Sequence, residues 1–230
     1  MATPKGLATW DSAKQEQYRR AQPQHVWTFH FCFDASPSMH GAEAAALQKA
    51  YALYLAWLQQ HADPMSLVEV CTFSSKLKRS PLQPLGRCTP LTPEQYNPLQ
   101  GSGTALYRAL GDLCTMPVGE GQHILVVFTD GQDNASDTTA WTASKVAQLL
   151  QTLQQEQSWL CVFLGAFPQA LDVGRACGFV VGNCLVFGDD RIPEAFQQLR
   201  QATQKYLQAA PADRKLLAAG GIFARNERTI

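Results

Sequence analysis

The sequence predicts an α/β fold: a doubly wound, mostly parallel central sheet with helices on both faces and one short antiparallel edge strand. Apolar runs of strand length alternate along the chain with longer segments whose apolar residues recur at spacings of three and four. With 230 residues, 46% of them hydrophobic, the chain can bury one sizeable core. No internal repeat or low-complexity segment interrupts the alternation, so we expect a single domain.

The first half of the chain predicts two strands, one helix and an edge hairpin. Residues 25–33 are an apolar run, and residues 41–61 carry apolar side chains at helical spacing before Pro64 ends the helix. Residues 67–73 contain the β-branched side chains typical of a strand. Residues 76–87 are basic and broken by proline, which suits an edge strand or hairpin because lysine and proline discourage edge-to-edge pairing.

The second half repeats the alternation of strand and helix. A proline-containing loop leads into a short predicted helix at residues 104–114, and a third long apolar run follows at residues 123–129. Residues 138–155 are predicted as a long helix with an apolar stripe. The remaining predicted elements are a strand at 159–164, a helix at 169–177, a short strand at 185–187 and a helix at 193–208.

Composition divides the chain into three parts. Residues 1–24 are polar and mixed in charge, and we expect them to form an amino-terminal extension. Residues 25–208 carry the alternating elements and form the predicted domain. Residues 209–230 are polar and contain two adjacent glycines, so we expect a peripheral carboxyl-terminal tail.

Charge and cysteine content narrow the function classes. The chain has 19 basic and 19 acidic residues, which argues against a nucleic-acid binder that relies on a basic face. The seven cysteines form no C-x-x-C pair and are odd in number, so we expect reduced thiols. No secretory apolar segment opens the chain, and no run approaches the roughly 18 apolar residues of a membrane span. These observations favour a cytoplasmic protein without membrane contact.

Oxygen-bearing side chains stand at the ends of the predicted strands. The first strand is followed by Asp34, Ser36 and Ser38, and the third long apolar run is followed by Asp130. Thr104 comes directly after Gly-Ser-Gly at the start of a predicted helix. Side chains at the carboxyl ends of parallel strands project into a crevice, and Mg2+ takes oxygen ligands with few carboxylates and some waters. The pattern therefore predicts a site for a small divalent cation.

These positions resemble the von Willebrand factor A (VWA) domain family, whose metal-ion-dependent adhesion site (MIDAS) is written D-x-S-x-S…T…D. The matching residues are Asp34, Ser36, Ser38, Thr104 and Asp130. The resemblance spans residues 25–190, and the finer match is to stand-alone bacterial and phage intracellular members. It implies a Rossmann-like fold in which the two serines bind the metal directly, the threonine binds directly or through water, and the aspartates act through coordinated waters.

Each part of the pattern also has a simpler interpretation. The two serines would serve equally well as caps of the following helix, and the last aspartate as part of an ordinary turn. All three parts in order, each at a strand end or helix start, favour the metal site. The cluster Asp133, Asn134 and Asp137 is either a second cation site or, more commonly for such clusters, a solvated loop with a helix cap.

We therefore expect a metal-dependent protein–protein interaction module. Mg2+, or alternatively Mn2+ or Ca2+, would accept an Asp or Glu carboxylate from a partner protein. The expected rim of the site comprises residues 39–41, 89–103 and 132–138. The resemblance implies a partner from a bacterial stress-response or AAA+ ATPase-associated system.

Two other functions remain open. A metal-dependent hydrolase or phosphatase of a doubly wound fold also has an aspartate after its first strand, but Ser36 stands where such a phosphatase has its second acid. The chain has no phosphate-binding glycine loop and no G-x-S-x-G elbow, so we expect no enzyme activity. An adaptor in an RNA–protein particle would bind RNA, which the balanced charge does not favour.

Overall fold

The computed structural model describes residues 27–98, 102–115, 121–137, 139–156 and 159–223. The predicted extension at residues 1–24 and the start of the predicted first strand lie outside these ranges. The strands are β1 (Trp27–Asp34), β2 (Leu67–Phe73), β3 (Leu77–Arg79), β4 (Gln83–Pro84), β5 (Gln122–Thr129), β6 (Leu160–Gly165) and β7 (Cys184–Val186). The α-helices are α2 (Ala42–His61), α3 (Leu106–Cys114), α4 (Ala143–Glu156), α5 (Ala170–Ala176), α6 (Ile192–Gln208) and α7 (Pro211–Gly220).

The strands form one seven-stranded sheet in the order β3-β2-β1-β5-β6-β7, with β4 also paired to β2. The strands β1, β2, β5, β6 and β7 run parallel, whereas β3 and β4 are antiparallel to β2. The strand order reverses at β1, which has β2 on one side and β5 on the other, and such a reversal creates a crevice at the carboxyl ends. The predicted doubly wound fold is confirmed, with two short antiparallel strands at the edge where the sequence predicted one.

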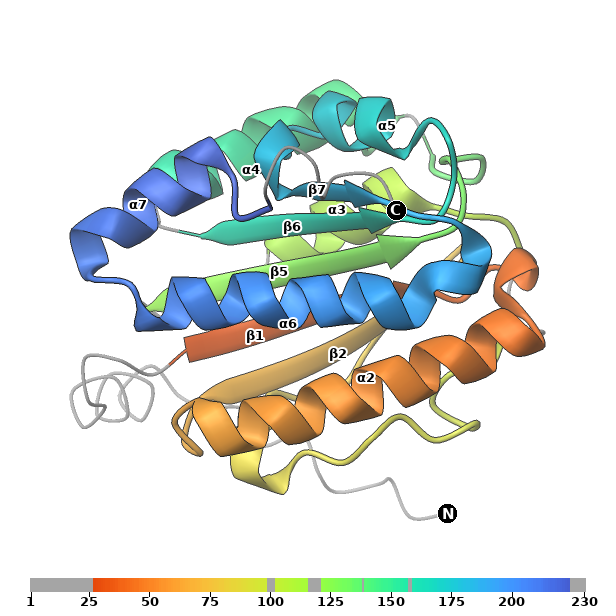
Figure 1. The fold of residues 1–230 in the computed structure, drawn as a ribbon. Helices are drawn as coiled ribbons and strands as arrows, with labels where there is room; N and C mark the ends of the chain where they lie inside the picture. Colours follow the sequence, from red (N-terminus) through yellow and green to blue (C-terminus); the bar gives the residue numbers. More distant parts are fainter. Residues whose placement is uncertain (1–26, 99–101, 116–120, 138, 157–158, 224–230) are drawn as a thin grey trace, which may run out of the picture.

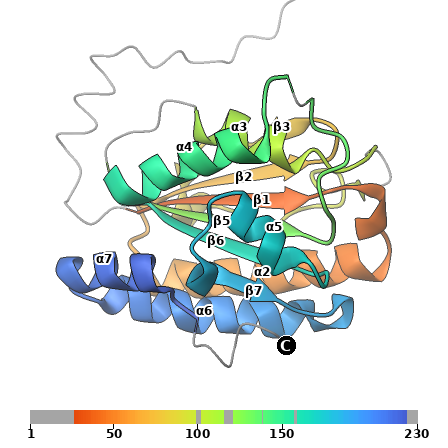
Figure 2. The ribbon, with the colours of Figure 1, turned by 90° about the horizontal axis from the view of Figure 1, so that it is seen from above.

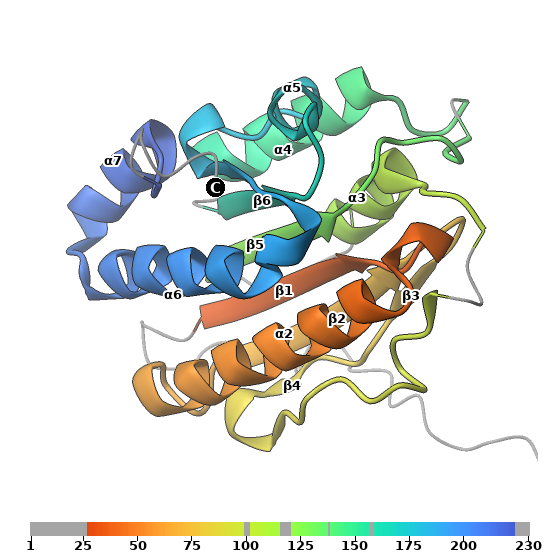
Figure 3. The same cartoon turned by 45° about the vertical axis from the view of Figure 1, so that its right-hand side comes forward.

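Helices cover both faces of the sheet, as Figures 1 and 2 show. Helices α2 and α6 lie side by side on one face, and α3, α4 and α5 cover the other (Figure 3). In β1, Phe29, Phe31 and Phe33 belong to the apolar cluster under α2 and α6, whereas Cys32 belongs to the cluster under α3 and α4. Burial on both faces explains why this strand is a continuous apolar run rather than an alternating pattern.

Aromatic contacts fix α2 over β1. The rings of Phe31 and Phe33 each lie 5.1 Å from the ring of Tyr51, at interplanar angles of 67° and 70°. Edge-to-face pairs of this kind stabilise by about 0.5–1.5 kcal/mol each beyond the area they bury. Because α2 follows β1 after a short turn, this packing also fixes the turn that carries the first part of the candidate site.

A partly buried ion pair attaches the edge strand β3 to the sheet. Arg79 donates from Nε and Nη2 to the two carboxylate oxygens of Glu69, at 2.6 and 2.9 Å, and His30 Nδ1 lies 3.1 Å from Glu69 Oε2. Burial alone would raise the pKa of Glu69, but these partners hold that pKa below its usual range. The pair holds β3 beside the carboxyl end of β2.

The helix predicted at residues 138–155 begins later, at Ala143. The ring of Trp141 packs so closely on α3 that a Cβ on Gly111 would lie 2.0 Å from it. Its Nε1 also donates to Asp112 Oδ1 at 2.9 Å. This docking holds the residues before Ala143 in a turn against α3, which the helical periodicity of the sequence does not indicate.

The segment after residue 209, predicted as a polar, peripheral tail, contains a helix without buried side chains and two buried apolar residues, and residues 224–230 lie outside the described ranges. The helix is α7, and Ile222 and Phe223 are buried in the cluster under α2 and α6. The Asn183 side chain holds this end of the fold, since its Nδ2 donates to the Ala218 carbonyl and its Oδ1 accepts the Ile222 N–H, both at 2.9 Å. The sequence does not indicate the burial of Ile222 and Phe223, because the Asn183 contacts beside them come from 35 residues or more away.

The cysteines and the membrane prediction can also be compared with the fold. All seven cysteines lie in the described ranges and are buried, and no disulfide joins any of them. They therefore act as small apolar side chains of the core, as the sequence predicted. Among the described residues, no helix combines the length and the apolar character needed to cross a membrane.

Candidate metal site

Asp34 is the last residue of β1, and its side chain is fully buried. Its Oδ1 accepts the Ser36 N–H at 2.8 Å, and its Oδ2 accepts the Thr129 hydroxyl at 2.6 Å. Burial raises the pKa of Asp34 to about 7; the two hydrogen bonds oppose this rise and the nearby Asp130 adds to it. Ionising a carboxyl in such surroundings is costly unless a cation lies beside it. Carboxyls with a strongly raised pKa are typical of functional sites.

Ser36 and Ser38 bring two hydroxyls together in the turn after β1. Their Oγ atoms lie 3.0 Å apart, and the Ser36 hydroxyl makes a long contact of 3.5 Å with Asp130 Oδ1. Ser36 is buried and Ser38 is exposed, so the pair extends from the crevice to the surface. The interpretation as helix caps lacks support, because neither the 3-10 turn Pro37–Met39 nor α2 has a side-chain cap hydrogen bond.

Thr104 is buried just before α3 and lies beside the turn that follows β5. Its N–H donates to Asn134 Oδ1 at 2.7 Å, and its carbonyl accepts the Asn134 N–H at 2.9 Å. Gly103 permits this packing, since its φ is +70° and a Cβ there would lie 2.9 Å from Asn134 Oδ1. A Cβ on Gly131 would lie 3.6 Å from Thr104 Oγ1, which places that hydroxyl next to the residue after Asp130.

The structure thus brings the five predicted site residues together at the carboxyl ends of β1 and β5. Two oxygens about 2.0–2.1 Å from Mg2+ in adjacent octahedral positions lie about 2.9 Å apart, close to the 3.0 Å between the Ser36 and Ser38 hydroxyls. Within the described ranges, no three His, Cys, Asp or Glu side chains form a metal-binding group. The available donors are two carboxylates and three hydroxyls, which suit a hard cation such as Mg2+, Mn2+ or Ca2+ better than zinc or copper.

The acidic cluster after Asp130 supports the loop and the start of α3. Asp133 Oδ2 accepts the Tyr107 N–H at 2.8 Å, and Asp133 Oδ1 accepts the Ser136 N–H at 3.1 Å. Asp137 Oδ1 accepts the Thr139 N–H at 2.9 Å. These bonds match the loop-and-cap interpretation of the cluster rather than a second cation site.

Two residues that the sequence did not single out hold Asp34 in place. Thr129, fully buried at the end of β5, donates to its carboxylate, and Tyr96 donates from its hydroxyl to the Asp34 carbonyl at 2.5 Å. Thr129 precedes Asp130 directly, so its position at a strand end was a usable signal. No signal in the sequence points to Tyr96, which lies 62 residues from its partner in a proline-containing loop.

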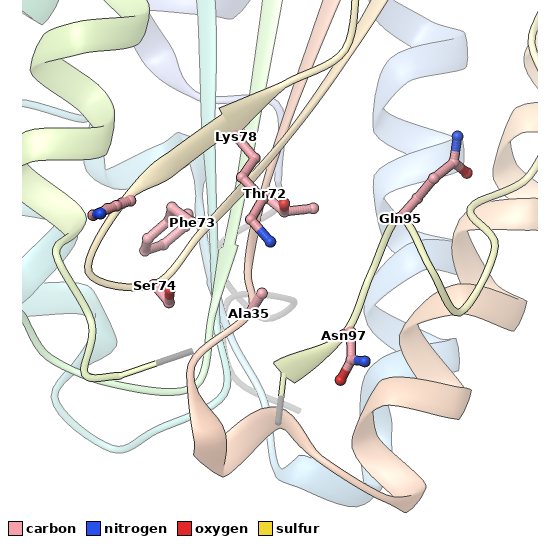
Figure 4. A pocket seen from close by; sticks show the side chains of 8 residues that line it. Ala35, Thr72, Phe73, Ser74, Lys78, Gln95 and Asn97 are labelled. Carbon is pink, nitrogen blue, oxygen red and sulfur yellow. The ribbon is translucent and has the colours of Figure 1, made fainter. Parts of the chain in front are cut away.

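A polar and cationic rim borders the site on the side of β2 and β3. Lys76 and Lys78 are exposed and line a hollow of about 20 Å³ together with Gln95 and Asn97 of the facing loop. Ala35, which separates the first two predicted ligands in the chain, belongs to the same hollow (Figure 4). None of the described residues that line it is acidic, and its volume admits only a water molecule or so. The rim therefore presents positive charge beside the candidate metal position.

Comparison with known proteins shows which fold this is. No family model matches the sequence, and no curated protein sequence matches it. Among solved structures, a von Willebrand factor type A protein from Catenulispora acidiphila aligns with a TM-score of 0.51 at 13% identity, over 78% of this chain and 43% of that one. The chain has the VWA fold.

Other VWA-fold structures align in the same way. The ArnB paralog VWA2 from Sulfolobus acidocaldarius gives a TM-score of 0.52 at 13% identity, over 77% of this chain and 46% of that chain. The pilus adhesin SpaC from Lactobacillus rhamnosus GG gives 0.62 at 12% identity, over 81% and 31%. The chain spans less than half the length of these three proteins. At these identities the likeness shows the fold alone.

Proposed function

We propose that the protein is a metal-dependent interaction module that binds an acidic residue of a partner protein. Mg2+, or alternatively Mn2+ or Ca2+, would be held by Asp34, Ser36, Ser38, Thr104 and Asp130. The observation that carries the proposal is the pair of serine hydroxyls beside a buried carboxyl, which are hydrogen-bonded at 3.0 Å, a separation that adjacent ligands of one cation also have. When bound, the cation supplies an open coordination position for a partner's carboxylate.

The residues around the site favour an acidic partner. Lys76 and Lys78 lie at the rim, where they attract a carboxylate that approaches the crevice. The hollow between them and the facing loop is too small for a substrate molecule, so recognition by the exposed surface fits better than enclosure. The pilus adhesin with the same fold is an example of an interaction protein in this fold class.

The enzyme alternative has less support. A phosphatase of this architecture needs a proton-transferring acid near the first aspartate, and the groups that bond to Asp34 here are Ser36, Thr129 and Tyr96. These hydroxyl and amide groups donate to Asp34, and hydroxyls are poor proton-transfer groups at neutral pH. We therefore propose a binding function without catalysis. RNA binding has no support from the balanced charge of 19 basic and 19 acidic residues.

A cytoplasmic location and a bacterial stress-response or AAA+ ATPase-associated partner complete the proposal. Seven buried cysteines without a disulfide are usual in a reducing compartment, which supports the location. The partner class rests on the resemblance of the sequence to intracellular bacterial VWA proteins. A metal-dependent pull-down from cytoplasmic extract, with and without a chelator, identifies the partner directly.

Thermal unfolding of metal-stripped protein tests the metal site. Addition of Mg2+, Mn2+ or Ca2+ is expected to raise Tm, because a ligand that binds only the native state stabilises it by mass action. Asp130→Asn removes one carboxylate that is partly exposed, so the variant folds and loses the response. Asp213→Asn, an exposed acid on α7, is the matched control and keeps the response. An equal rise in Tm for both variants would refute the assignment of the site.

A further inference from the structure

We propose that a cavity at the amino-terminal edge of the sheet binds a small organic anion. The cavity has a volume of about 640 Å³, within the range of about 300–1,000 Å³ that small-molecule sites occupy. Its walls come from the first residue of β5, the last turns of α4, the end of α5 and the segment after it, the end of α6, and α7. It lies at the opposite end of β5 from the candidate metal site, beside α7, which Figure 1 labels, and the proposal is independent of the proposed function.

The described side chains that line the cavity carry a net positive charge. Arg175, Arg214 and Lys215 line it, and none of its described lining residues is acidic. Arg175 comes from α5 and the other two from α7, so the cations approach from two different elements. Cations grouped in one concave site, with no acidic side chain among the described lining residues, favour an anionic occupant. Phosphate and carboxylate groups both fit this chemistry.

Arg214 is held in position before any ligand arrives. Its Nη1 donates to Gln122 Oε1 at 2.9 Å and its Nη2 to the Leu207 carbonyl at 3.1 Å. Its guanidinium carbon lies 4.8 Å from the centre of the Trp27 ring, which is a cation–π contact. Among the described residues, its buried Nε has no hydrogen-bond acceptor. A pre-positioned guanidinium loses little entropy when its charge attracts an anion.

The other lining groups define the rest of the ligand. Phe179 and Tyr206 offer apolar ring surface, so the anion has a partly apolar body. Gln154 donates from Nε2 to two carbonyls at 3.0 Å, while its buried Oε1 has no donor among the described residues.

The ends of the chain do not match the cavity in charge. Residues 1–26 contain four basic and two acidic residues, and residues 224–230 contain two basic residues and one acidic residue. Both segments are therefore net positive, which disfavours either of them as the occupant of a cationic cavity. A separate anionic molecule is the better match.

Isothermal titration calorimetry of the full chain with three probes tests the proposal. The probes are 1-naphthyl phosphate, 1-naphthoate and the neutral 1-naphthol. The two anions are expected to bind saturably, and 1-naphthol about tenfold more weakly, because charge-assisted contacts are lost. Whichever of the two anions binds more tightly shows whether phosphate or carboxylate is preferred.

Substitutions of the exposed residues Arg175 and Lys215 test the cavity without disturbing the folded core. Arg175→Gln and Lys215→Gln are each expected to weaken anion binding by about threefold to tenfold, and more together. Arg200→Gln changes an exposed arginine of α6 outside the cavity and is expected to leave binding unchanged. Equal affinity for 1-naphthol and the anions, unchanged binding in both cavity variants, or no saturable heat with either anion would each overturn the proposal.

Discussion

Thr129→Val tests whether the orientation of Asp34 controls metal binding. The substitution keeps the size and branching of a fully buried side chain but removes its hydroxyl. That hydroxyl donates to Asp34 Oδ2 at 2.6 Å and accepts the Gly131 N–H at 3.2 Å. The variant therefore removes one support from the Asp34 carboxyl and one from the turn that carries Asp130.

The expected loss of unfolding free energy follows from the negative charge of the Asp34 carboxylate. A hydrogen bond to a charged group contributes about 1.5–3 kcal/mol, and valine leaves both partners without this contact. We expect the free energy of unfolding at pH 8 to fall by about 2 kcal/mol, which lowers Tm by about 4–8 °C for a domain of this size. The loss also raises the pKa of Asp34 above its value of about 7, so less carboxylate is available to a cation near neutral pH.

Urea unfolding at pH 8 measures the loss of stability, and urea unfolding at pH 7, with a chelator and then with excess Mg2+, measures the effect on metal binding. Thr203→Val is the matched control, because Thr203 is equally buried and its hydroxyl lies 2.7 Å from the Tyr54 hydroxyl, remote from the site. The control is expected to lose about 1 kcal/mol and to keep the full stabilisation by Mg2+. Thr129→Val is expected to lose most of that stabilisation. If both variants gain as much from Mg2+ as the parent, the role assigned to Thr129 is refuted.

Three further predictions concern pH, packing and the rim. Because the pKa of Asp34 is raised to about 7 by burial, the metal-free protein is expected to lose roughly 4 kcal/mol of unfolding free energy as pH rises from 4 to 8, and Mg2+ is expected to reduce this loss. Gly111→Ala places a methyl group 2.0 Å from the ring of Trp141 and is expected to cost about 1–3 kcal/mol in chemical denaturation. Charge reversal at both Lys76 and Lys78 is expected to weaken binding of the partner isolated by pull-down about tenfold, without changing the Tm response to Mg2+.

Each of these predictions has a matched control. Asp34→Asn is expected to flatten the pH profile, and an unchanged slope would contradict the assignment to this carboxyl. Gly220→Ala adds a methyl group in open space, so it is expected to be near neutral, and a loss equal to that of Gly111→Ala would argue against the Trp141 contact. Arg200→Glu changes a charge away from the rim, and an effect on partner binding as large as that of the lysine variants would indicate a non-specific charge effect.

The fold and most of the site follow from patterns that are local in the sequence. Asp34 and Asp130 stand out because long apolar runs end at or just before them, and parallel pairing of β1 with β5 brings the two strand ends together. Thr104 follows a glycine whose positive φ lets the loop pack on Asn134. Metal binding itself stays a prediction.

Other features depend on contacts between distant parts of the chain. The Tyr96 hydroxyl reaches the Asp34 carbonyl across 62 residues, and nothing near Tyr96 in the sequence indicates this. The late start of α4 depends on the docking of Trp141 against α3, which overrides helical periodicity. The tail was predicted as peripheral because its composition is polar, whereas two of its apolar residues complete the core through Asn183.

The burial of Ile222 and Phe223 beside Asn183 also affects when the core can be completed during protein synthesis. β1 is made early but has β5 as a neighbour, and the cluster that covers one face of β1 includes Ile222 and Phe223. A nascent chain that stops before Ile222 leaves part of this apolar face uncovered, and such exposed surface is prone to aggregation. The domain therefore completes the packing of this cluster only after residue 223 has left the ribosome.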